Sequence, residues 1–152
     1  MAEVEGMESK KIYELDLNIT GVADYGVAID AILSGKEKVP LQGARFDAAF
    51  EGTGKGRIAG KVRGVDYVRM RADGCVDLDV RATLETEDGH RIAAHIDGVG
   101  TLRANERIVD LAENGRLTTA APTYDWVNSR QIWALGTANL ATGKIHVVGF
   151  MQ

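Results

Sequence analysis

The sequence predicts an all-β fold, an antiparallel and roughly eight-stranded barrel, closed or nearly closed, with one or two short helices. Two observations carry this prediction. First, the segment 65–97 contains two Asp-Gly turns, Asp73-Gly74 and Asp88-Gly89, between runs that alternate apolar and polar residues. Glycine takes the positive φ that a tight hairpin turn needs. Second, the chain has 18 glycines and only two prolines, a composition typical of a turn-rich β protein.

The 152 residues are sufficient for one domain with a substantial core. Residues 1–10 are acidic and polar and are expected to form a flexible N-terminal tail, which leaves 11–152 as a single barrel domain. The run from Ile12 to Ile19 alternates cleanly and is predicted to be the first strand. Its apolar face is formed by Tyr13, Leu15, Leu17 and Ile19.

The next segments are less regular. Residues 24–34 fit either a short helix that ends at Gly35 or a short strand, and both alternatives stay open. Residues 38–50 and 56–62 are predicted to be strands. The glycine-rich run between them, 51–56, is expected to be an exposed flexible loop.

The two Asp-Gly turns define the register of a three-strand meander. If each is a type I turn closed by a glycine bulge, Thr86 pairs with His90 and Arg71 with Cys75. A two-residue loop at the second turn would mix apolar and polar side chains on each face and is rejected. In the chosen register one face is wholly apolar, with the facing pairs Val80 and Ile96, Ala82 and Ala94, Leu84 and Ile92, Val68 and Leu78, and Met70 and Val76.

After the meander, Asn105 is positioned to cap a short helix over 106–113, with Gly115 just beyond its end. Residues 124–135 and 145–150 supply the last predicted strands. The total of about eight strands closes a barrel that is just wide enough for packed side chains or one small ligand.

Composition excludes several classes of function. The formal net charge of −4 and the absence of a basic run argue against nucleic acid as a partner. No apolar run is long enough for a membrane span, and the N-terminus lacks the apolar core of a signal peptide. Cys75 is the only cysteine, so no intrachain disulfide can form, and a reducing cytoplasm is the expected location.

No cofactor or metal is predicted. The run at 52–56 resembles a phosphate-binding loop but lacks its first glycine and its magnesium-binding hydroxyl residue. The histidines are His90, His95 and His146. His95 and Asp97 share a strand face without an identifiable third ligand, so a structural role for His95 is favoured.

The polar face of the meander brings chemically active residues together. Asp79 lies opposite Asp97, Arg81 lies opposite His95, and Tyr67 lies beside Asp79. If this face is solvated, diagonal contacts with the basic residues offset the repulsion between the two carboxylates. If it lines a water-poor cavity, Asp79 or Asp97 would be the acid or base. His95 would relay protons, and Arg81 and Tyr67 would stabilise developing negative charge. Antiparallel sheets usually expose their polar face, which favours the first interpretation.

A second cluster consists of Tyr124, Trp126 and Asn128, which alternate and are predicted to share one face of a strand. Core packing is one interpretation. Because three polar groups need partners if they are buried, a lumen that holds a small molecule is the other. Together with Thr83, these residues are the predicted ligand-binding set.

From about Val39 to the C-terminus, the chain resembles the bacterial and fungal "domain of unknown function 3237" family. Residues 64–67, 71–74, 78–89 and 121–128 carry the likeness. The resemblance implies a small antiparallel β-barrel, of lipocalin-like (calycin-like) or allene-oxide-cyclase-like shape, and implies no mechanism. The positions that match are Asp66, Tyr67, Arg71, Asp79, Arg81, Thr83, Tyr124, Trp126 and Asn128.

The chain also departs from the family pattern. Members often have a tyrosine in the strand after the second Asp-Gly turn, where this chain has Ala93, His95 and Asp97. From the predicted barrel and its two polar clusters, we expect a protein that holds a small organic molecule and acts on it as a cofactor-independent isomerase, cyclase or lyase. Two alternatives are a non-catalytic carrier of an apolar ligand, and a solid barrel that serves as an interaction module with its polar face in a homodimer contact.

Overall fold

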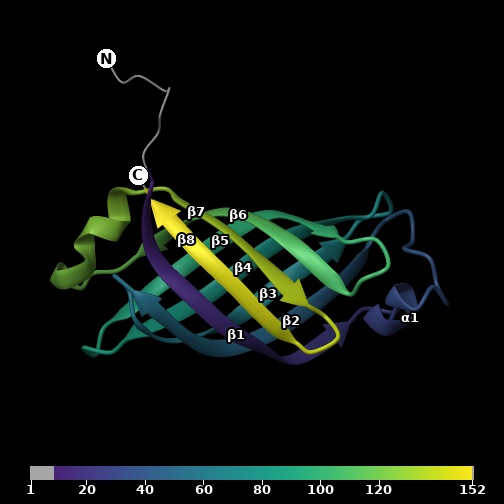
Figure 1. Cartoon of the computed structure of the whole chain (residues 1–152), viewed down its shortest axis with the longest axis horizontal. Helices are drawn as coiled ribbons and strands as arrows, with labels where there is room; N and C mark the ends of the chain where they lie inside the picture. The colour runs from purple at the N-terminus through teal and green to yellow at the C-terminus, as the bar shows by residue number, and fades with distance from the viewer. Residues whose placement is uncertain (1–8, 152) are drawn as a thin grey trace, which may run out of the picture.

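Eight antiparallel strands form one closed sheet in the computed structural model, which describes residues 9–151 (Figure 1). Each strand pairs with the next in the chain, and the last pairs with the first. The predicted all-β barrel is confirmed. The strands are β1 (Lys10–Asp24), β2 (Ala44–Gly56), β3 (Gly60–Met70), β4 (Cys75–Thr86), β5 (Arg91–Leu102), β6 (Ile108–Thr118), β7 (Ile132–Asn139) and β8 (Lys144–Met151).

The expected tail, residues 1–10, lies mostly outside the described residues. Lys10 is already part of β1, where it faces Met151 of β8. The first strand is longer than predicted because a register shift near Lys11 and another near Ile19 let β1 follow both of its neighbours around the barrel.

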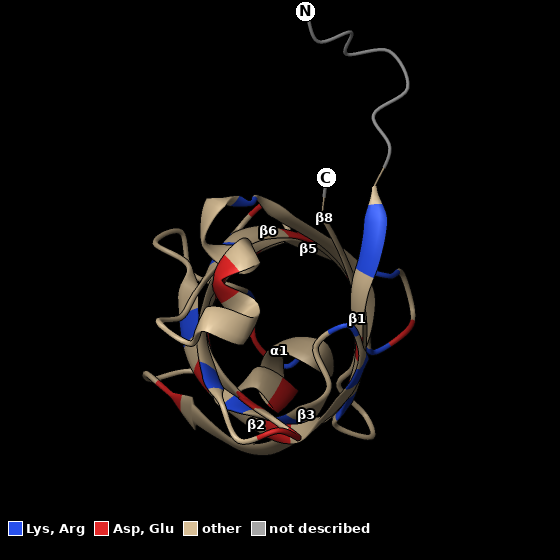
Figure 2. Ribbon diagram, turned by 90° about the vertical axis from the view of Figure 1, so that its left-hand side faces the viewer, with Lys and Arg blue, Asp and Glu red and all other residues tan. Residues whose placement is uncertain are grey.

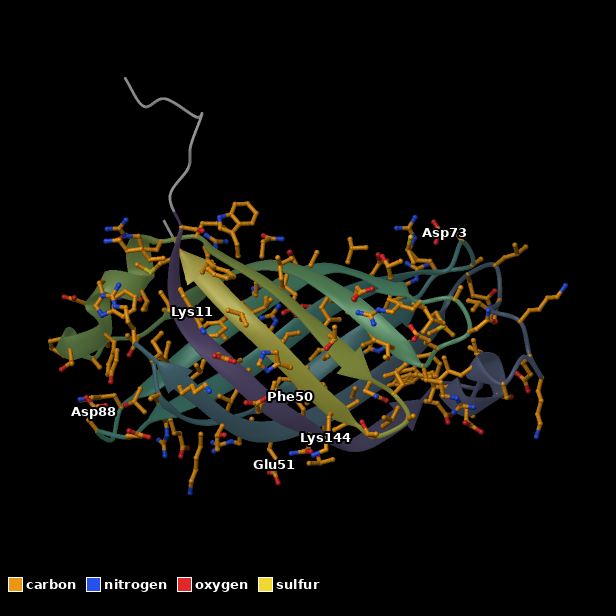
Figure 3. The ribbon with its side chains drawn as sticks, viewed as in Figure 1. Lys11, Phe50, Glu51, Asp73, Asp88 and Lys144 are labelled. Carbon is orange, nitrogen blue, oxygen red and sulfur yellow. The ribbon has the colours of Figure 1, made fainter. Side chains whose placement is uncertain are left out.

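The predicted register of the meander is confirmed. The backbone N–H of Arg71 donates to the Cys75 carbonyl at 2.9 Å, and that of Thr86 donates to the His90 carbonyl at 2.8 Å. The two turns lie at opposite ends of the barrel, as the labels Asp73 and Asp88 show in Figure 3. The facing pairs Met70 and Val76, Val80 and Ile96, Ala82 and Ala94, and Leu84 and Ile92 all occur as counted.

The expected loop at 51–56 is wrong, since these residues continue β2, and the turn to β3 comes after Gly56. Gly52 lies against the backbone of β1, where an added Cβ would be 2.1 Å from the Asp16 carbonyl oxygen. The glycine here allows close strand approach rather than loop flexibility. The alternation also continues, because Phe50 is buried while Glu51 points away from the barrel (Figure 3).

Within the described part of the chain, helical structure is limited to α1 (Ile29–Leu33) and the 3₁₀ helix η1 (Pro122–Ser129). The ambiguous segment 24–34 thus contains a short helix. The predicted helix over 106–113 is wrong: Asn105 takes φ 60° in the β5–β6 turn, and Ile108 begins β6. The predicted strand over 124–135 begins only at 132, because the chain turns into η1 with Pro122 at its start.

Side chains on the inner face of the strands form the core, and the helices lie at the two ends of the barrel (Figures 1 and 2). At one end Val127 of η1 is fully buried. At the other end α1 lies within the outline of the ring when the barrel is viewed along its axis (Figure 2), and it buries none of its residues fully. Neither helix of the described chain has the length and apolar character that a membrane crossing requires.

Candidate functional site

The lumen contains a cavity of about 130 Å³. An apolar cavity of about 150 Å³ is large enough to hold benzene, so this space suits a small ring-sized molecule. Its lining reaches from Tyr13 near the start of β1 to Ile29 of α1 at the far end. Among the described residues that line it, Asp66 and Glu113 carry the only charges, Tyr13 adds a phenol, and all the others are apolar.

Asp66 enters the lumen from β3, where it faces the buried Val80 of β4. The backbone N–H of Asp79 donates to its Oδ1 at 3.0 Å. Burial raises the pKa of Asp66 to about 6, the Asp79 charge adds to the increase, and the Asp79 hydrogen bond opposes it. Near neutral pH, Asp66 is therefore mostly ionised yet close to its titration point.

Glu113 enters the lumen from β6, between Gly98 of β5 and Ala134 of β7. Within residues 9–151, no hydrogen bond is formed to its carboxyl group. Burial raises the pKa of Glu113 to about 7, and the nearby charge of Asp66 raises it further. Glu113 thus keeps its proton more readily than Asp66, which makes the two carboxyls unequal.

Tyr13 lies on the same row of facing residues as Glu113. Tyr13 faces Gly149 of β8, Gly149 faces Ala134, and Ala134 faces Glu113, so no bulky side chain separates the phenol from the carboxyl. The Tyr13 ring covers Gly149, where an added Cβ would lie 2.3 Å from two of its ring atoms. Burial and the Glu113 charge raise the pKa of Tyr13 well above its usual value, so the phenol stays a hydrogen-bond donor.

The structure brings the predicted polar cluster together, but on the outer face of the barrel. Asp79 faces Asp97, and Arg81 faces His95, as counted from the sequence. His95 Nε2 lies 3.5 Å and Arg81 Nε 3.8 Å from Asp79 Oδ1. The Asp79, Arg81 and His95 side chains are each at least half exposed. This placement favours the solvated interpretation of the face.

Other members of the predicted set are also outside the lumen. Asp97 accepts a 2.6 Å hydrogen bond from Asn114 Nδ2. The Tyr67 ring is 5.4 Å from the Arg45 guanidinium carbon. Thr83 lines a shallow surface depression together with Arg81 and His95. None of these residues lines the lumen cavity. The catalytic and binding roles predicted for them stay predictions.

Tyr124, Trp126 and Asn128 do not share the face of a strand, because all three belong to η1. The Tyr124 hydroxyl donates to Asp88 Oδ1 at 2.8 Å, and the Arg57 guanidinium carbon lies 4.1 Å from the centre of a Trp126 ring. The Tyr124 hydroxyl and the Trp126 ring therefore make their contacts at the end of the barrel. None of the three lines the cavity.

Asn128 has a structural role in the conformation described here. Its Oδ1 accepts from the Thr119 N–H and its Nδ2 donates to the Thr119 carbonyl, both at 2.8 Å. Replacing Asn128 with alanine should lower the free energy of unfolding by about 1–2 kcal/mol through loss of both hydrogen bonds. Chemical denaturation checks this, with Ser129→Ala as the neighbouring exposed control. An unchanged midpoint for Asn128→Ala would show that the pair contributes nothing.

Sequence reasoning did not assign the three polar residues of the lumen to a candidate site. Asp66 could have been found, since counting back from Met70 and Val68 in steps of two places it on the apolar face. A carboxyl group on an apolar face is a signal in itself. Glu113 was assigned to the helix wrongly predicted over 106–113, and Tyr13 was identified only as part of an apolar face.

No site for a metal ion is evident between residues 9 and 151, where no three His, Cys, Asp or Glu side chains come together. His95 and Asp79 approach each other without a third such ligand.

The family described as "Protein of unknown function (DUF3237)" matches residues 27–148. The chain belongs to this DUF3237 family. The match begins upstream of Val39, where the resemblance was expected to start, and it spans the strands that carry Asp66 and Glu113. No curated protein matches the chain.

Solved structures share the fold. A protein of unknown function from Clostridium acetobutylicum has TM-score 0.78, 17% identity, and coverage of 96% of this chain and 99% of that one. A beta-barrel like protein from Acinetobacter baumannii has TM-score 0.67, 18% identity, and coverage of 98% and 99%. An enzyme from Penicillium herquei has TM-score 0.59, 19% identity, and coverage of 94% and 93%. At these identities the likeness is one of fold.

Proposed function

We propose that this DUF3237 barrel binds a small, mostly apolar organic molecule in its lumen and catalyses proton transfer within that molecule. The observation that supports the proposal is the placement of Asp66, Glu113 and Tyr13 in an otherwise apolar cavity. Burying a carboxyl without a charged partner is costly, and a packed barrel of this size has no structural need for two. Groups of this kind are typical of catalytic sites.

The roles follow from the two environments. Asp66 holds its charge more readily because the Asp79 N–H stabilises its carboxylate, which suits a base that accepts a proton from a C–H or O–H group. Glu113 has no such donor and retains a proton near neutral pH, which suits an acid. Tyr13 can donate a hydrogen bond to an oxygen that gains negative charge.

An acid and a base in one cavity can move a proton between two positions of a bound molecule, which is an isomerisation. Such a reaction needs no redox step and no group carried by a cofactor. The similar structure named an enzyme from Penicillium herquei is compatible with catalysis in this fold, but its likeness extends only to the fold.

Hydrogen exchange into an enolisable ketone tests the proposal directly. Cyclohexanone, a ring-sized carbonyl compound, is incubated with the protein in D₂O, and α-deuteration is followed by NMR. We expect exchange above the buffer rate, with a loss of about 100-fold or more in Asp66→Asn and in Glu113→Gln, because each removes one proton-transfer group.

Matched substitutions on the outer face separate the two candidate sites. Asp79→Asn, Asp97→Asn and His95→Ala should keep the exchange rate if the lumen is the site. If instead these three abolish exchange while the lumen variants keep it, the outer cluster predicted from sequence is the catalytic one.

A carrier of an apolar ligand is the second candidate, and the apolar lining of the cavity favours it. The orientation of the meander also supports this alternative, since its apolar face lies inside the barrel and its polar face outside. Retention of cyclohexanone without exchange would support the carrier. Failure to bind any ring-sized probe would favour an interaction module.

A further inference from the structure

We infer that the lumen selects uncharged ring-sized molecules that bear a hydroxyl or carbonyl group, and that it rejects organic anions. This inference rests on the proposed function, since it concerns the ligand of the same cavity. It is carried by the composition of the described lining, in which two carboxyls and a phenol are the only polar side chains and no Lys, Arg or His is present.

The exclusion of anions follows from electrostatics. A carboxylate or phosphate in the cavity would meet the charge of ionised Asp66, and of Glu113 whenever it ionises, and no Lys, Arg or His of the described lining balances these charges. Two like charges separated by several ångströms in a protein interior repel strongly enough to weaken binding by about tenfold or more. The backbone N–H of Asp79 is already donated to Asp66 and is not free to bind an anion.

A cation is disfavoured for a different reason. An ammonium group would lose its hydration in a cavity whose lining is apolar apart from these three side chains. Ionised Asp66 could pair with it only in surroundings that disfavour charge, and pairing with Glu113 would require that group to give up its proton. Buried ion pairs often fail to recover the cost of desolvation. An uncharged ligand requires neither the loss of an ion's hydration nor a change in the protonation of Glu113.

An uncharged oxygen function fits the free hydrogen-bonding capacity of the site. Glu113 has no hydrogen-bond partner within residues 9–151 and, when protonated, offers one O–H donor. Tyr13 supplies a second donor on the same row of facing residues. Ionised Asp66 accepts from a ligand hydroxyl. A molecule with one hydroxyl or carbonyl group can therefore be held while its ring contacts the apolar wall.

Three probes of similar size test this selection: benzyl alcohol, benzoate and benzylamine, titrated at pH 7 and followed by methyl NMR. Methyl groups of Leu15, Leu78 and Ile96 report on the lumen, and those of Val99 and Leu135, which lie on the outer face and are exposed, serve as controls. We expect benzyl alcohol to shift the lumen methyls alone and to bind at least about tenfold more tightly than benzoate, with benzylamine also weaker.

The isosteric double variant Asp66→Asn/Glu113→Gln should narrow the gap between benzyl alcohol and benzoate by about tenfold, because it removes repulsion while leaving the desolvation of benzoate unchanged. Benzoate or benzylamine binding in the wild-type lumen as tightly as the alcohol would overturn the selection and leave the ligand-binding barrel in place. If no probe moves the lumen methyls, the proposed function itself is wrong, and the inference falls with it.

Discussion

The free energy of unfolding should fall as the pH is raised from 5 to 8. Asp66 and Glu113 have pKa values raised by burial, from 3.8 to about 6 and from 4.5 to about 7. Between the unfolded and folded values the native state binds more protons than the unfolded state, so stability decreases with pH. Stabilisation from these groups is complete below about pH 4 and is lost by about pH 7, on the order of 2–3 kcal/mol for each.

The range from pH 5 to 8 matters because other groups change the free energy of unfolding in the opposite direction at lower pH. Partly exposed carboxyls outside the lumen, such as Asp47 and Glu85, have pKa values lowered, first by hydrogen bonds from Arg45 and Arg63 respectively. Their contribution is present above their unfolded pKa values and is lost as the pH falls below them. Chemical denaturation at pH 5, 6, 7 and 8 therefore separates the lumen carboxyls from these other carboxyls.

The double variant Asp66→Asn/Glu113→Gln should flatten this dependence and be more stable than the wild type at pH 8 by a few kcal/mol. Glu51→Gln, which removes an exposed charge on the outer face, should leave the slope unchanged. A wild-type stability that rises from pH 5 to 8 would mean that the two carboxyls are not held in an environment that disfavours their charge.

Replacing Gly52 with alanine should cost about 3 kcal/mol or more. The added Cβ would lie 2.1 Å from the Asp16 carbonyl oxygen and 2.7 Å from the Leu17 Cα, both in the backbone of β1. A paired strand cannot move away without breaking its ladder to β2, so the contact between the first two strands would open. The loss is measured as a shift in the denaturant midpoint.

Gly21 provides the matched control. It lies near the register shift of β1, and an added Cβ would meet nothing within 4 Å. Gly21→Ala should therefore have nearly wild-type stability. If the two variants were equally stable, close approach of strands at Gly52 would not be what requires a glycine there.

The parts of the fold that sequence could predict are those determined by local turns and by alternation. The Asp-Gly turns at 73–74 and 88–89 fixed the meander register, because a one-residue slip would have reversed its faces. The glycines at 52 and 54 were misinterpreted because a glycine that allows close strand approach and one that permits loop flexibility look alike in a single sequence.

The candidate site was harder to predict because it depends on how the sheet closes. The outer cluster around Asp79 was located correctly within the meander, but only closure decides which face of a sheet becomes the lumen. Glu113 was not recognised as a site residue for a local reason. Ile108, Leu111 and Ala112 have the spacing of a helix, yet the same segment, with Val109, also fits a strand. Tertiary pairing of β6 with β5 and β7 selects the strand.

The pairing of β1 with β8 has a further consequence. Lys10 faces Met151, so the ends of the described chain lie side by side at one end of the barrel (Figure 1). A short linker could join these ends, and new termini could be opened at the Asp73-Gly74 turn at the other end of the barrel. Such a circular permutant would keep every pair of neighbouring strands and lose only the turn between β3 and β4. The architecture is thus defined by a cycle of neighbouring strands, and the gap between β8 and β1 is one of several places at which that cycle can be cut.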